Sequence, residues 1–210
     1  MPLKILLIED PFSHDTKLAD NLPALLGKNS ILQTINITAE QAKTPMQVTA
    51  KLPLPKGDFD FVLLNIFTGL ATRMWLLPIN IDPYFDQELS FMLRKLRTIY
   101  PNSCISLILP PLPSAERSMY PYCRSSWLGR LSFYNLNSSI QRFYRRHPQK
   151  NLEVVPLYLS IAPNDYWPHR LNGQRIRSGH TLTAQGQKKA AETIGAFLVY
   201  KSIEQKESDQ

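Results

Sequence analysis

The sequence has few cysteines and no long apolar run, and both absences limit what the protein is. Its two cysteines, Cys104 and Cys123, lie in unlike contexts and show no metal-binding spacing. This argues against a disulfide framework and favours a reducing compartment. No apolar run reaches the roughly 18 residues that a membrane-spanning helix needs. The apolar stretch at the N-terminus is too short for a secretory signal and has no small-residue cleavage site, so we expect a cytoplasmic location.

Acidic residues are scarce only in the second half of the chain. Residues 1–105 carry 10 Lys or Arg and 10 Asp or Glu, whereas residues 106–210 carry 14 and 7, so the net charge of +7 belongs to the second half. The densest local group of basic residues is Arg142, Arg145, Arg146, His147 and Lys150. It is either a solvated basic face or a surface that binds a polyanion.

What the sequence does contain is an opening apolar run that stops at two acids and a proline. Residues Ile5 to Ile8 are continuously apolar, which is typical of a strand covered on both faces in a parallel sheet. Ligands of such sheets bind beyond the carboxyl ends of the strands, so residues 9–15 lie where chemistry is expected. A helix with leucines at helical spacing follows and ends at Gly27. Ser13 or Asp15 is expected to cap it.

Strands and helices alternate along the rest of the chain. Further strands are predicted at residues 31–37, 59–66, 104–109 and 152–157. Helices are predicted at residues 83–100, before Pro148 and around residues 190–198, with a weak one at 39–52. This order predicts an α/β fold, a three-layer α/β/α sandwich with a five-stranded parallel sheet of the doubly wound, flavodoxin-like kind. We expect one domain over residues 1–200 and a polar tail over 201–210 that frays.

Several loops are expected at the carboxyl edge of the sheet and predict a binding cleft there. Residues 112–123 and 160–181 are long irregular segments, and a turn at Thr68 and Gly69 leads into another loop. The residues expected to line or bind in this cleft are Asp10, Ser13, His14, Thr68, Arg73, Trp75, Tyr120, Tyr122, Tyr166, Trp167 and His180. For the aromatic members, partial burial under the loops is the alternative.

Four segments of the chain resemble the SGNH or GDSL hydrolase family, in the same order. The strand from Lys4, with Glu-Asp-Pro-Phe-Ser after it, is similar to the family's opening strand and Gly-Asp-Ser-Leu-Ser turn. Residues 59–65 resemble the strand before its Gly-x-Asn-Asp block, and residues 85–111 resemble its next helix and strand. Residues 178–186 resemble the closing Asp-Gly-x-His-Leu-Thr-x-x-Gly segment. The resemblance covers nearly the whole chain and implies the hydrolase fold and serine esterase or acyl hydrolase chemistry.

The residues that the family uses for chemistry are replaced in this sequence. Pro11 stands at the place of the nucleophilic serine, which removes both the hydroxyl and a backbone N–H of the oxyanion hole. Gly69 stands at the place of an oxyanion asparagine, and the closing aspartate and histidine become Ser178 and Thr181. We therefore expect a pseudoenzyme that has lost esterase activity and acts as a binding or interaction protein.

Two other classes of function stay open. In the first, an active ester or acyl hydrolase uses a rearranged site with Ser13 as nucleophile, His180 as base and Asp10 as orienting acid. The alternative for these residues is that Ser13 caps a helix and His180 is an ordinary loop histidine. In the second class, a basic adaptor binds nucleic acid or another polyanion through Arg142, Arg145, Arg146 and Lys150.

A metal centre is not expected. The acids and the imidazole that follow the first strand are Glu9, Asp10, His14 and Asp15. Neighbouring residues of this kind do not define a coordination geometry. The sequence therefore predicts no metal and no cofactor, and it does not identify the ligand or partner.

Overall fold

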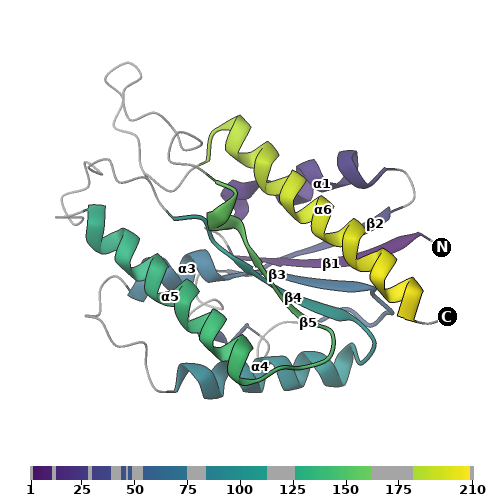
Figure 1. Cartoon of the computed structure of the whole chain (residues 1–210), viewed down its shortest axis with the longest axis horizontal. Helices are drawn as coiled ribbons and strands as arrows, with labels where there is room; N and C mark the ends of the chain where they lie inside the picture. Colours follow the sequence, from purple (N-terminus) through teal and green to yellow (C-terminus); the bar gives the residue numbers. More distant parts are fainter. Residues whose placement is uncertain are drawn as a thin grey trace.

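One parallel sheet lies at the centre of the molecule (Figure 1). The computed structural model describes residues 2–10, 13–27, 30–38, 44–45, 47–48, 54–74, 84–112, 126–161 and 182–208. The strands are β1 (Leu3–Glu9), β2 (Ser30–Asn36), β3 (Phe61–Asn65), β4 (Cys104–Leu109) and β5 (Leu152–Pro156). All neighbours are parallel and their order is β2-β1-β3-β4-β5. The predicted five-stranded parallel sheet is confirmed.

Helices cover both faces of this sheet (Figure 1). One face is covered by α1 (Leu18–Leu26) and α6 (Ala184–Ser208), and the other by α3 (Phe67–Met74), α4 (Phe85–Ile99) and α5 (Ser126–Arg146). Two short 3-10 helices, η1 (Ser13–Thr16) and η2 (Leu157–Leu159), follow β1 and β5. The layers form the predicted α/β/α sandwich.

The first strand supplies both halves of the core. Ile5 and Leu7 pack with the α1 and α6 side, and Leu6 and Ile8 pack with the α3, α4 and α5 side. All four side chains are fully buried. Burying one such side chain contributes roughly 1.5–3 kcal/mol, which explains why the central strand is continuously apolar.

The turn predicted at Thr68 and Gly69 and the loop predicted around Arg73 are wrong. Residues Phe67–Met74 form helix α3 instead, and Trp75 lies outside the described residues. Phe67, Leu70 and Ala71 recur at helical spacing and are buried. This apolar face outweighs the turn preference of a single glycine.

Of the two predicted caps of α1, Ser13 is wrong, and the side chain of Asp15 lies outside the described set. The helix begins after Lys17, which has a left-handed backbone with φ of 47°, and the Lys17 side chain makes no capping hydrogen bond. The short helix η1 lies between β1 and α1, so Ser13 is too early in the chain to cap α1. At the other end, Gly27 follows the helix as predicted, with φ of 75°.

Residues 201–208 are helical rather than frayed. Helix α6 continues to Ser208, and Lys201 within it forms ion pairs with Glu153 of β5 and with Glu204. A contact with the sheet therefore holds this polar stretch. In the described part of the chain, no helix is long and apolar enough to cross a membrane.

Candidate functional site

Buried polar residues gather where β1 and β3 end. We call Glu9, Asp10, Ser13, Thr16 and Asn65 the polar cluster; each has at most 4% of its surface exposed. Glu9 and Asn65 are register partners on adjacent strands, and the other three lie in the segment that follows β1. The cluster therefore occupies the edge of the sheet at which parallel α/β proteins bind ligands.

The carboxylate of Asp10 joins the two segments that leave this edge. Its Oδ1 accepts a hydrogen bond from the Ser13 backbone N–H at 2.6 Å, and its Oδ2 accepts one from the Gly69 N–H at 2.7 Å. These donors lie at the starts of η1 and α3, where the first N–H groups of a helix have no partner within the helix. One side chain thus caps two helices, and its negative charge is favourable at both ends.

Asn65 fixes η1 against the sheet from the other side. Its Nδ2 donates to Glu9 Oε1 at 2.9 Å and to Thr16 Oγ1 at 3.1 Å, with a longer contact of 3.4 Å to the Ser13 carbonyl oxygen. Thr16 Oγ1 in turn donates to the same carbonyl at 2.7 Å. The side chain of Asn65 therefore holds the segment after β1 against the end of β3.

The side chain of Ser13 makes none of the hydrogen bonds in this network. Its residue surface is fully buried, and its Oγ has no hydrogen-bond partner within the described part of the chain. The interpretation of this hydroxyl as a helix cap is wrong, because the backbone of Ser13 makes the contacts while its Oγ makes none.

The structure brings together some of the residues that the sequence predicts for the cleft. Asp10, Ser13 and Thr68 lie at this edge, with Thr68 in the first turn of α3. His14 lies in η1 and Arg73 in α3, but their side chains are outside the described set. The remaining predicted cleft residues are outside the described ranges: Trp75, Tyr120, Tyr122, Tyr166, Trp167 and His180. The same holds for Ser178 and Thr181, so pairing of Ser13 with His180 stays a prediction.

Sequence reasoning missed the contributions of Thr16 and Asn65. The available signal was that Asn65 ends a buried strand, as Glu9 does, so that two polar side chains follow apolar runs at one edge. Among the described residues, no group of three or more His, Cys, Asp or Glu side chains is placed to hold a metal ion.

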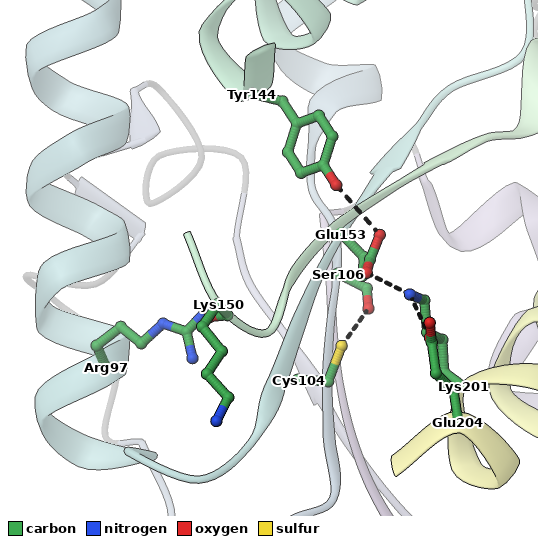
Figure 2. Close-up of polar contacts among 8 residues, drawn as sticks. All are labelled: Arg97, Cys104, Ser106, Tyr144, Lys150, Glu153, Lys201 and Glu204. Atoms are coloured by element: carbon green, nitrogen blue, oxygen red, sulfur yellow. Dashed lines mark hydrogen bonds and ion pairs between the residues drawn. The ribbon is translucent and has the colours of Figure 1, made fainter. Parts of the chain in front are cut away.

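A second polar group lies at the outer edge of β5, and we call Tyr144, Glu153, Lys201 and Glu204 the edge cluster (Figure 2). Lys201 Nζ lies 2.5 Å from Glu153 Oε1 and 2.7 Å from Glu204 Oε2, and Tyr144 Oη donates to Glu153 at 3.4 Å. Burial would lower the pKa of Lys201, but hydrogen bonds to the two glutamates raise it above its ordinary value. These charges are paired with one another, so the edge cluster is structural.

Cys104 lies beside this cluster and is buried. Its Sγ is 3.8 Å from Ser106 Oγ, and burial raises the pKa of the thiol. A raised thiol pKa lowers the thiolate fraction that nucleophilic chemistry needs. Cys104 is free and buried, as a packing residue is.

Comparison with solved structures identifies the fold. The chain is similar to a protein from Streptococcus pneumonia provisionally described as a platelet activating factor, with 18% identity, a TM-score of 0.66 and coverage of 94% of this chain and 85% of that one. It is similar to the aryl esterase of M. smegmatis at 12% identity and a TM-score of 0.64, covering 94% and 99% of the two chains. It is also similar to a GDSL-like lipase from Bacteroides thetaiotaomicron at 16% identity and a TM-score of 0.57, covering 94% and 88%.

No family model and no curated protein matches the sequence. The structural neighbours named as esterases, lipases and acylhydrolases nevertheless share one architecture with this chain. The chain has the α/β fold of the SGNH/GDSL hydrolases, as its sequence motifs predict. At these identities the likeness extends to the fold and not to the chemistry.

Proposed function

We propose that this chain is a pseudoenzyme of the SGNH/GDSL fold that binds a ligand or partner at the carboxyl edge of its sheet and does not hydrolyse esters. The proposal rests on the hydrogen bonds that the Asp10 carboxylate accepts. Its carboxylate accepts the N–H groups of Ser13 and Gly69, so neither donor is available to an oxyanion. The edge is arranged for structure rather than for acyl transfer.

The sequence supports the same conclusion at the nucleophile. Pro11 has neither a hydroxyl nor an N–H, and Gly69 has no side-chain amide. Removing one oxyanion donor costs roughly a hundred- to a thousand-fold in rate. Losing the nucleophile and two donors together leaves hydrolysis near the uncatalysed background.

A ligand at this edge would lie above the polar cluster, whose residues are buried. The residues proposed to contact it are Thr68 of α3 and those outside the described ranges that the sequence predicts for the cleft. The fold class suggests a small ester-like or acyl-bearing ligand, because its neighbours include an aryl esterase.

The second candidate is an active hydrolase with Ser13 as nucleophile, His180 as base and Asp10 as orienting acid. It is favoured by the Ser13 Oγ, which is buried and unbonded within the described residues. It is disfavoured by Asp10, whose two carboxylate oxygens already accept backbone N–H groups at two helix starts.

Hydrolysis of short-chain aryl esters by purified protein tests the proposal. We expect turnover indistinguishable from buffer in the wild type and in Ser13→Ala and His180→Ala. Ser106→Ala is the matched control, because Ser106 is also a fully buried serine but lies within β4. Turnover that is lost in Ser13→Ala and His180→Ala but kept in Ser106→Ala would establish the rearranged site instead.

Binding is tested separately by thermal shift with a panel of short-chain acyl esters and acetylated sugars. We expect at least one compound to raise the melting temperature of the wild type and to have no effect on Trp75→Ala. Failure of the whole panel to shift the wild type would remove the small-ligand part of the proposal.

A further inference from the structure

A basic surface lies at the carboxyl ends of α4 and α5. We call Arg94, Arg142, Arg145, Arg146 and Lys150 the basic helix-end surface. All five are exposed, and within the described residues none of them forms an ion pair. Arg142 also contacts Ser139 Oγ at 2.9 Å, one turn back on the same helix.

Arg97 brings the two helix ends together. Its guanidinium donates to the Ser103 carbonyl oxygen at 3.2 Å and to the Lys150 carbonyl oxygen at 2.5 Å. Figure 2 shows the Lys150 side chain beside Arg97, with its Nζ pointing away from Lys201. Charges that lie about 50 residues apart in sequence are thus neighbours at one end of the molecule.

This surface is separate from the polar cluster. Helices α4 and α5 each end just before a strand begins, since β4 starts at Cys104 and β5 at Leu152. The starts of parallel strands share one edge of the sheet, opposite to the edge where β1 and β3 end. The two surfaces therefore do not compete, and this inference does not rest on the proposed function.

The part of the surface on and after α5 has no acidic neighbour close in sequence on its N-terminal side. No Asp or Glu stands between Glu116 and Glu153 in the sequence, so α5 carries no acidic residue. Glu153 itself pairs with Lys201. Cations in the last turn of a helix interact favourably with the helix dipole. This explains the positions of Arg145 and Arg146, but it does not explain those of Arg94 and Lys150.

We propose that the basic helix-end surface binds the phosphate backbone of a nucleic acid. Four of its five cations are arginines, whose planar guanidinium matches phosphate oxygens in a bidentate manner. A membrane-binding surface combines cations with apolar side chains that insert into lipid. No exposed large apolar side chain lies between Arg142 and Lys150, although Phe91 is exposed one turn before Arg94. The part of the surface on and after α5 therefore fits a phosphate chain better than a bilayer.

Fluorescence anisotropy with a short labelled single-stranded DNA, measured over a salt series, tests this proposal. Three to five phosphate contacts predict a slope of log affinity against log salt of about −2 to −4. In Arg145→Gln/Arg146→Gln, we expect binding to weaken at least about tenfold at low salt and the slope to become shallower by about 2. The variant Arg145→Lys/Arg146→Lys keeps both positive charges, so the dependence of its affinity on salt should stay close to that of the wild type.

The matched control is Lys17→Gln/Lys188→Gln, which removes the same charge from two exposed lysines away from this surface. It should bind as the wild type does. The proposal is overturned if the wild type does not bind the DNA at low salt, or if the control loses as much affinity as the arginine variant. It is also overturned if the arginine pair is needed for binding vesicles of anionic phospholipid but not for binding DNA.

Discussion

Asp10 shows how a single side chain can join the starts of two helices at the carboxyl edge of this sheet. In the family pattern this aspartate precedes the nucleophile, and here a proline follows it. Asp before Pro is a favoured sequence at the start of a helix. Its carboxylate accordingly binds the N–H groups at the starts of η1 and α3.

Replacing Asp10 should therefore lower stability. Asp10→Ala leaves two buried backbone N–H groups without their acceptor, at about 1–3 kcal/mol each, so we expect the free energy of unfolding to fall by about 2–4 kcal/mol. Asp10→Asn keeps one acceptor oxygen and should lose less. Urea unfolding gives these values, and exposed Asp58→Ala is the control. Equal, small losses in Asp10→Ala and Asp58→Ala would refute the capping role.

Tyr100 is a second residue whose environment has a measurable consequence. Its hydroxyl donates to the Pro55 carbonyl oxygen at 2.8 Å, and burial raises its pKa from 10.0 to about 12. Above pH 10 the unfolded chain releases this proton while the folded chain retains it. Stability must therefore fall as the pH rises from about 10 towards 12.

Tyr100→Phe isolates this contribution. Near neutral pH the variant should be less stable than the wild type by about 1 kcal/mol, because the hydrogen bond is lost. Above pH 10 the difference should shrink, because phenylalanine does not ionise. Unfolding curves measured at a series of pH values check this, and two stability profiles that stay parallel from neutral pH to pH 12 would show that Tyr100 does not carry the effect.

At the scale of elements, the strands could be predicted from the sequence and the ends of several helices could not. Continuous apolar runs mark β1, β3 and β4, because both faces of these strands are buried. Helix α3 was missed because a short stretch with a glycine resembles a turn. The carboxylate that accepts the Gly69 N–H at the start of this helix belongs to Asp10, which lies 59 residues earlier in the sequence. The last turns of α6 were missed for a similar reason, because Lys201 depends on Glu153 of β5.

In the candidate site too, features set by local sequence could be predicted and features set by distant contacts could not. Its position could be predicted, since it depends only on where strands end. The bonds within it could not, since the contact of Asn65 with Glu9 requires the register of two strands that are 56 residues apart in sequence.

The ion pair between Glu153 and Lys201 should hold the end of α6 on the sheet. We expect Lys201→Met to lower stability, and a double-mutant cycle with Glu153→Gln to give a coupling of about 0.5–1 kcal/mol, since the pair is partly exposed. Because the pKa of Lys201 is raised, its contribution is fully present below pH 10.5 and is lost as the pH rises further.

Denaturant unfolding near neutral pH gives the coupling energy. The cycle of Lys188→Met with Glu192→Gln is the control. That pair is more exposed and its atoms are 3.8 Å apart, so its coupling should be near zero. A coupling for Lys201 that is no larger than that of the control would mean that α6 is held by its apolar contacts alone.

At the scale of the whole molecule, the two edges of the sheet differ in character. The edge where β1 and β3 end carries the buried polar cluster. The opposite edge carries exposed arginines on two helix ends. The shared hydrolase fold positions both surfaces, and neither requires ester hydrolysis.

The central claim is that this SGNH/GDSL fold lacks a serine nucleophile. Intact-mass spectrometry after incubation with a fluorophosphonate, which modifies activated serines covalently, tests it most directly. We predict an unmodified mass for the wild type under conditions in which a serine esterase is fully labelled. A wild-type adduct that maps to Ser13 and is absent in Ser13→Ala would contradict the account and establish a relocated catalytic serine.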